Sequence, residues 1–315
     1  MLNYYKCSAE KIEHVSKREN SNWIQIENPT KQEMELLAKE LTIPKKFLED
    51  ALDSEERSRV EQNLSHEDQP YSFLIVECPY ETKDELGYKL FETMPIGILL
   101  TKDYVITISK KVMPFIDDML QDRLGDFDRS DKWQFMLKLF LGATNYFLKY
   151  LNDIIKETNQ LEINLKKSMK NEKLYAFMAI QKSLVFFATA LQSNKIIVEQ
   201  LEEKEILHNQ ELKLLLKEVR IENRQAVTMT ETYSNVISGM SDIFSSVISN
   251  NLNLVMKFLA SVTIILSIPT IISSAYGMNI KLPIAHYDHA FAVLNSLTVV
   301  ICAILVVLFW KKKYF

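Results

Sequence analysis

A tyrosine, a glycine, a methionine and an asparagine stand in a row, Tyr276-Gly277-Met278-Asn279, where a long uncharged stretch gives way to a polar loop. Gly277 would permit the positive-φ turn that ends a helix and would direct the next residues inward. Mg²⁺ gives up its bound water reluctantly, so a site that catches this ion should accept hydrogen bonds from that water. The amide oxygen of Asn279 can do so without holding the ion as tightly as a ring of carboxylates. The four residues are therefore a candidate site for a hydrated divalent cation, with an ordinary helix C-cap as the alternative.

Two uncharged stretches lie in this part of the chain, and the candidate site is at the end of the first. The first covers 258–280, which is 23 residues, and the second covers 290–310, which is 21 residues. At a rise of about 1.5 Å per residue, a helix of either length crosses a hydrocarbon core about 30 Å thick. We therefore expect transmembrane helices at 258–277 and 290–310, joined by an external loop at 278–289.

The distribution of lysines predicts how these spans are oriented. Lys311, Lys312 and Lys313 lie in the short tail 311–315, whereas the predicted loop holds a single cation, Lys281. Because cations are retained on the cytoplasmic side, we expect the tail in the cytoplasm. The first residues lack the apolar run of a signal peptide, so the N-terminal part is expected there as well. We therefore expect a protein that is embedded in the lipid of the cell membrane, with both termini in the cytoplasm.

The composition argues against several other classes of protein. A formal net charge of −4 gives no sign of nucleic-acid binding. The three cysteines, Cys7, Cys78 and Cys302, have no paired spacing, so neither a disulfide framework nor a zinc site is expected. The sequence has no glycine-rich nucleotide loop and no pair of histidines on one helix, and we expect neither nucleotide binding nor an enzyme. Binding of Zn²⁺ or Cu²⁺ by His286 and His289 in the loop remains a minor alternative.

Prolines divide the chain into zones. Six of the eight prolines lie within 29–114, and none lies between 114 and 269. The proline-rich zone, 1–113, mixes alternating apolar segments with helical ones, which predicts an α/β domain with a mixed sheet. The expected strands are 23–26, 71–76, 96–100 and 104–108, and the expected helices are 31–41 and 45–52.

The rest of the chain has helical periodicity with few breaks. We expect a helical hairpin at 114–206 that turns at Asn171-Glu172-Lys173, followed by a stalk helix at 207–257 that continues into the first span. This single helix would have roughly 70 residues, and because so long a helix needs packing along its length, it implies oligomerisation. Pro269 removes the helical hydrogen bond to the Ile265 carbonyl, and a slight bend is the expected effect.

Small and polar residues recur along this helix in alternating steps of three and four. This set, called the polar seam below, comprises Asp242, Ser246, Ser249, Asn253, Met256, Ala260, Thr263, Ser267, Thr270 and Ser274. Polar groups have no partner in lipid, so the seam should face protein or water. Its continuation towards Asn279 favours a water-containing axial pathway. In the alternative, Ser and Thr bond to their own helix carbonyls and small residues only let helices pack closely.

These features together resemble the CorA family of magnesium/cobalt channels, within the metal ion transporter superfamily that carries a Gly-Met-Asn motif. The resemblance rests on Tyr276-Gly277-Met278-Asn279 at the end of the first of two C-terminal spans, the lysine-rich tail, and the segments Leu48-Glu49-Asp50-Ala51-Leu52 and Leu100-Thr101-Lys102-Asp103-Tyr104-Val105. It implies a homopentamer whose stalks and first spans surround one pore for passive uptake of Mg²⁺ and Co²⁺, driven by the membrane potential. By the same resemblance, Asn279 would ring the outer mouth, Thr270, Met256, Asn253 and Asp242 would line the pore, and Met256 and Leu259 would form a hydrophobic gate.

The resemblance also implies a channel that closes when cytosolic Mg²⁺ bridges acids of neighbouring subunits. Glu218 on the stalk matches one such acid, and its partner would be Glu81, Asp84 or Glu85. The loop departs from the family pattern because its only acid is Asp288, so selectivity would rest more on Asn279. A Zn²⁺, Ni²⁺ or Co²⁺ transporter of the same fold, and a membrane-tethered sensor that does not conduct, are the alternatives.

Overall fold

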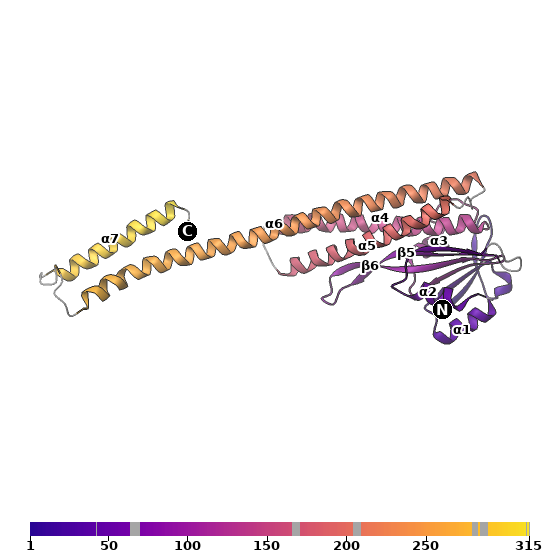
Figure 1. The fold of residues 1–315 in the computed structure, drawn as a ribbon, viewed down its shortest axis with the longest axis horizontal. Helices are drawn as coiled ribbons and strands as arrows, with labels where there is room; N and C mark the ends of the chain where they lie inside the picture. Colours follow the sequence, from indigo (N-terminus) through magenta and orange to yellow (C-terminus); the bar gives the residue numbers. More distant parts are fainter. Residues whose placement is uncertain are drawn as a thin grey trace. The chain divides into compact units, whose positions relative to one another are not determined.

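The computed structural model describes residues 1–41, 43–63, 70–165, 171–203, 209–278, 283, 289–312 and 314. They form two compact units, Met1–Ile237 and Ser238–Phe315, and each unit is described by itself. A seven-stranded sheet with helices on both faces makes up most of the first unit, and two apolar helices make up most of the second (Figure 1).

The sheet is mixed, as predicted. Its strands are β1 (Leu2–Cys7), β2 (Ile12–Val15), β3 (Trp23–Glu27), β4 (Arg59–Asn63), β5 (Tyr71–Lys83), β6 (Lys89–Leu100) and β7 (Val105–Ser109), in the order β2-β1-β3-β7-β6-β5-β4. The β3–β7 pair is parallel and the other neighbours are antiparallel. The four predicted strands correspond to β3, β5, β6 and β7, whereas β1, β2 and β4 were not predicted.

Alternation along the strands sends side chains into two cores, one on each face of the sheet. Phe73 and Ile75 of β5 pack with helices α1 (Lys31–Glu40) and α2 (Lys45–Leu52). Leu74 and Val76 point to the opposite core, where they meet α3 (Pro114–Leu120) and α4 (Lys132–Leu165). Figure 1 shows the sheet between these two groups of helices. A short 3-10 helix, η1 (Arg18–Asn20), precedes β3.

The predicted helical hairpin consists of α4 and α5 (Asn171–Glu203). The expected turn at Asn171-Glu172-Lys173 is wrong, because these residues begin α5. Glu172 lies in the first turn of that helix, where a negative charge is favoured by the helix dipole. A polar tripeptide of this kind is therefore compatible with a helix start as well as with a turn.

The buried amide of Asn194 fixes α5 to the sheet. Its Oδ1 accepts hydrogen bonds from the Glu77 backbone N–H and the Ser58 hydroxyl, each at 2.9 Å, and its Nδ2 donates to the Glu77 carbonyl at 2.8 Å. Unpaired, a buried amide would cost a few kcal/mol, so this pairing specifies how α5 lies on β4 and β5.

Helix α6 (Gln210–Tyr276) confirms the prediction of one long helix, and its 67 residues include Pro269. Helix α7 (Ala290–Lys311) follows it in the chain. Three described helices are long and apolar enough to span a membrane, namely α5, α6 and α7. In the apolar part of α5, 44% of residues are buried inside the structure, against 6% in α6 and 0% in α7. Packing on the sheet accounts for the apolar character of α5, whereas the apolar surfaces of α6 and α7 are largely uncovered.

Candidate functional site

The predicted ion site lies at the end of α6. The N–H of Gly277 donates to the Ser273 carbonyl at 2.9 Å, and the N–H of Met278 donates to the Ala275 carbonyl at 3.4 Å. The expected positive φ at Gly277 is wrong, since among the described glycines only Gly87 and Gly125 have one. A Cβ at Gly277 would instead lie 3.3 Å from the Ser273 carbonyl oxygen. The lack of a side chain at Gly277 therefore serves close packing on the last helical turn. Asn279 lies outside the described residues.

Tyr276 connects the end of α6 to the segment that follows it. Its hydroxyl donates a hydrogen bond of 3.2 Å to the carbonyl of Pro283. A tyrosine at the end of an apolar helix has an amphipathic ring that suits the boundary between lipid and water. Tyr276 thus brings Pro283 to the helix end that also carries Gly277 and Met278.

One face of α6 is in contact with α7. The thiol of Cys302 on α7 donates to the Ile265 carbonyl at 3.7 Å, and the Lys257 ammonium lies 5.8 Å from the ring centre of Tyr314. Ser261, midway between Lys257 and Ile265, is only 1% exposed. Steps of four residues place all three on one side of a helix, so this side is the one that α7 covers.

From Met256 to Ser274, the polar seam lies on the side of α6 that faces away from Ser261. At about 100° per residue, Met256, Ala260, Thr263 and Thr270 are rotated by about 100–180° from Ser261. All four are exposed, as are the other seam residues apart from the half-buried Ser267. The seam is therefore a surface of α6 that its own chain leaves open.

The seam hydroxyls bond to their own helix, as the alternative interpretation expected. Ser246, Thr263, Ser267 and Thr270 donate to helix carbonyls at distances of 3.0, 2.8, 2.8 and 3.2 Å. A hydroxyl has one proton and two lone pairs, so these bonds use the proton and leave the oxygen as an acceptor. The open face of α6 therefore presents oxygen acceptors, and the protons of ion-bound water are suitable donors to them.

Met256 and Leu259, the predicted hydrophobic gate, lie on the same open face. Their exposed fractions are 56% and 57%. Leu259 is rotated by about 160° from Ser261 and is thus also turned away from α7. Several copies of this face around an axis would bring apolar side chains together at one level of the seam.

The predicted regulatory acids are engaged in different ways. Glu81 forms an ion pair with Lys89 at 3.2 Å, near the ends of β5 and β6. The Oδ1 of Asp84 accepts the N–H groups of Leu86 at 3.0 Å and Tyr88 at 2.8 Å, so Asp84 shapes the β5–β6 turn. Glu218 is exposed on the part of α6 that belongs to the first unit. Within the described residues of one chain, no cluster of three metal-binding side chains is found, and the pairing of Glu218 stays a prediction.

Two further acids near Glu81 were not identified from the sequence. Burial raises the pKa of Glu157 on α4; Lys89 acts against this rise, and the charges of Asp153 and Glu81 add to it. Asp153 and Glu157 are four residues apart and thus lie on one face of α4. That spacing is the signal that could have drawn attention to them.

The fold is that of a protein with a large folded unit followed in the chain by apolar helices long enough to span a membrane. Residues 18–313 match the family model described as CorA-like Mg²⁺ transporter protein. The chain belongs to this family, which is a family of membrane transporters rather than enzymes. The predicted resemblance and fold class are confirmed.

Individual relatives agree with the family. The cobalt/magnesium transport protein CorA of Methanocaldococcus jannaschii is 27% identical over 305 residues, covering 93% of this chain and 90% of that protein. The protein of the same name from Thermotoga maritima is 25% identical over 274 residues, covering 85% and 75%. The complete structure of the M. jannaschii CorA magnesium transporter matches with a TM-score of 0.82 at 23% identity, covering 100% of this chain and 99% of that one. The full-length CmaX protein matches with a TM-score of 0.73 at 12% identity, covering 100% and 98%. At these identities, the two structures support the fold alone.

Proposed function

We propose that this chain forms a homopentameric channel for passive, potential-driven uptake of Mg²⁺, and also of Co²⁺, across the cell membrane. Membership of the CorA-like family and two relatives named as cobalt/magnesium transport proteins support the choice of ions. The observation that carries the proposal is the polar seam on the face of α6 that α7 leaves open. Five copies of α6, with their seams towards one axis, line the pore.

Contact with lipid would be unfavourable for the polar groups on the open face of α6. Thr263, Ser267 and Thr270 lie within the predicted span, where lipid offers their oxygens no hydrogen-bond donors. Assembly around an axis gives these groups water and ion-bound water as partners. The number of copies, five, rests on the family resemblance.

The chemistry of the seam suits a hydrated ion. Mg²⁺ keeps most of its water shell, and the oxygens of Thr263, Ser267 and Thr270 accept hydrogen bonds from that shell. Asn279 at the mouth supplies an amide oxygen for the same purpose. A divalent cation gains about 4.6 kcal/mol per 100 mV on entering a negative interior, enough for roughly 10³-fold accumulation without ATP.

The lengths of α6 and α7 support the topology that we propose for the channel. Lys257 lies nineteen steps before Tyr276 (276 − 257). This interval corresponds to about 28 Å of helix, which matches the hydrocarbon core. The chain crosses the membrane twice, with the loop 278–289 outside and both termini in the cytoplasm. Cytosolic Mg²⁺, bound between Glu218 of one subunit and Glu81 or Asp84 of the next, closes the channel.

The experiment is Mg²⁺ uptake by proteoliposomes that contain the full chain and a dye inside. Asn279→Ala should abolish uptake, whereas Asn295→Ala, on the exposed surface of α7, serves as the matched control and should leave uptake unchanged. Competition with Zn²⁺, Ni²⁺ and Co²⁺ ranks the ions. Uptake by Asn279→Ala equal to that of the unmodified chain would contradict the proposal, and no uptake by the unmodified chain would favour a non-conducting sensor.

A further inference from the structure

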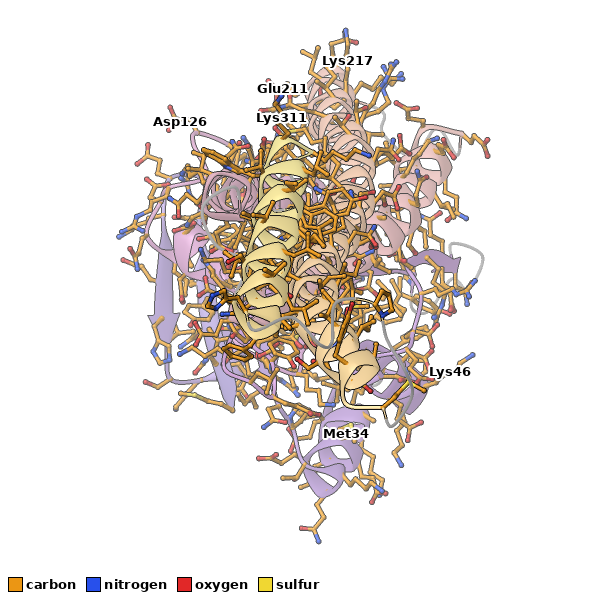
Figure 2. The ribbon with its side chains drawn as sticks, turned by 90° about the vertical axis from the view of Figure 1, so that its left-hand side faces the viewer. Met34, Lys46, Asp126, Glu211, Lys217 and Lys311 are labelled. Atoms are coloured by element: carbon orange, nitrogen blue, oxygen red, sulfur yellow. The ribbon has the colours of Figure 1, made fainter. Side chains whose placement is uncertain are left out.

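Three lysines from two distant parts of the sequence lie at one end of the α6–α7 pair. Lys311 ends α7 and Lys312 follows it, and Figure 2 shows Lys311 at the tip of that helix. Lys257 belongs to α6 and reaches the same end through its contact with the ring of Tyr314. Tyr314 is held there by its N–H, which donates to the Phe309 carbonyl at 3.0 Å. Tyr314 therefore lies back towards α6.

These lysines carry positive charge without carboxylate partners. All three are exposed, and among the described residues none has a carboxylate oxygen within 4.0 Å. An anion near this end of the helix pair would interact favourably with all three positive charges. The arrangement thus has the charge of an anion site.

The surroundings of the lysines are apolar and aromatic. Trp310 is 73% exposed and Phe258 is 50% exposed, and each is adjacent in sequence to one of the lysines. Exposed aromatic rings beside lysines are typical of the boundary between the hydrocarbon core and the headgroups. An occupant that uses both surfaces has an anionic head and apolar chains.

We propose that Lys257, Lys311, Lys312 and Tyr314 form a binding site for the phosphate of an anionic phospholipid in the adjoining leaflet. The lysines bind the phosphate, and the acyl chains lie on Phe258 and Trp310. If the lysines only kept the C-terminal tail on the cytoplasmic side of the membrane, lysines at the end of α7 would be sufficient. This role would not require Lys257 or the return of Tyr314 towards α6, and basic pockets between spans are known to bind such headgroups.

The site joins the base of the first span to α7. Met256, which precedes Lys257, is part of the gate in the channel proposed above, so a bound lipid would steady that end of α6. This consequence rests on the proposed function, whereas the lipid site itself does not.

Trp310 serves as the reporter of lipid binding. The full chain is reconstituted in vesicles in which phosphatidylglycerol or phosphatidylcholine carries brominated chains, and quenching of fluorescence is measured. The signal of Trp310 is isolated by subtracting that of Trp310→Phe, because Trp23 and Trp133 belong to the other unit and are present in both proteins. Brominated phosphatidylglycerol should quench Trp310 more strongly at equal mole fraction.

The variant Lys257→Gln distinguishes lipid binding at the proposed site from general electrostatic attraction of anionic lipids to the lysines of the tail. It retains Lys311 and Lys312, which preserve the orientation, and should lower the preference for phosphatidylglycerol about fivefold. Lys257→Arg should retain the preference. Lys213→Gln, an exposed lysine of α6 in the other unit, is the matched control and should also retain it.

Three results would overturn the proposal. Equal quenching by the two lipids would show that no anionic headgroup is preferred. An unchanged preference in Lys257→Gln would assign the effect to the tail alone. Loss of the preference on addition of millimolar inorganic phosphate would assign the lysines to free phosphate instead of lipid.

Discussion

The thiol of Cys302 lies 3.7 Å from the carbonyl oxygen of Ile265, the one carbonyl of the first predicted span that Pro269 deprives of its helical N–H donor. A donor from α7 thus replaces the bond that the proline removes from α6. Within a membrane an unpaired carbonyl is costly, so this weak bond has a defined role. This bond links the part of α6 next to Pro269 to the middle of α7.

The Cys302–Ile265 bond can be tested with a double-mutant cycle. Cys302→Val removes the donor and should lower the free energy of unfolding by about 0.5–1 kcal/mol. Pro269→Ala restores the backbone N–H, so the same cysteine change should cost close to nothing in that background. Thermal unfolding of the four proteins in detergent measures both values. An equal cost of Cys302→Val in the two backgrounds would show that the thiol does not serve this carbonyl.

The hydrogen bond from Tyr276 to Pro283 predicts that the Tyr276 hydroxyl stabilises the outer mouth of the proposed pore. Tyr276→Phe removes a bond worth about 0.5–1.5 kcal/mol and should loosen the segment after α6. We expect faster proteolysis within 278–289 and lower Mg²⁺ uptake, with an unchanged unfolding midpoint of the first unit. Tyr233→Phe, a half-buried tyrosine on the same helix, is the control. Identical cleavage rates in both variants would exclude this role of the Tyr276 hydroxyl.

Asp84 allows its turn-forming role to be separated from metal binding. Asp84→Asn keeps the Oδ1 that accepts the N–H groups of Leu86 and Tyr88, but it loses the negative charge. If Asp84 binds regulatory Mg²⁺, this variant should need several-fold more Mg²⁺ for protection of the chain from protease, as should Glu218→Gln. Asp84→Ala should in addition destabilise the turn by about 1–3 kcal/mol. If Asp84→Asn is protected at the same Mg²⁺ concentration as the unmodified chain, Asp84 only stabilises the turn and does not bind regulatory Mg²⁺.

Glu77 predicts how stability depends on pH. Burial raises the pKa of this carboxyl from 4.5 to about 7, against the opposing effect of a hydrogen bond from Thr93. The folded state therefore keeps the proton after the unfolded state has lost it, and stability falls as pH rises from about 4.5 to about 7. The loss amounts to at most about 3 kcal/mol. Glu77→Gln should remove this decline in unfolding scans between pH 5 and pH 8, whereas the exposed Glu10→Gln should retain it. The same slope in Glu77→Gln would refute the assignment.

Much of the fold could be predicted because its signals are local. Helix α2 has the bounds expected from its periodicity, and α6 was expected from the absence of break signals before Pro269 together with the apolar stretch that contains this proline. The missed strands carry weaker signals. β2 has four residues and β4 is largely polar and charged, so partner strands specify them rather than their own pattern.

The candidate site was predictable in its positions along α6 but not in its orientation. Which face of α6 remains open depends on where α7 packs, and that follows from Cys302 and Tyr314, which lie far away in sequence. The positive φ expected at Gly277 did not form because its N–H continues the helical hydrogen bonding to Ser273. Similarly, the role of Asp84 in a turn depends on backbone groups that no residue pattern displays.

The open face of α6 is the central claim, and a matched pair of variants tests it. Thr263→Leu combined with Ser267→Leu fills the seam with apolar volume and removes its acceptors. Ser296→Leu makes the same kind of change on the exposed surface of α7. Both proteins should fold and assemble, because each change adds apolar surface to a helix in lipid or protein.

The most direct measurement is the current through planar bilayers with Mg²⁺ as the sole permeant cation. The unmodified chain and Ser296→Leu should carry inward Mg²⁺ current, and the Thr263→Leu/Ser267→Leu protein should carry none. Full current in the seam variant would contradict the assignment of this face to the pore.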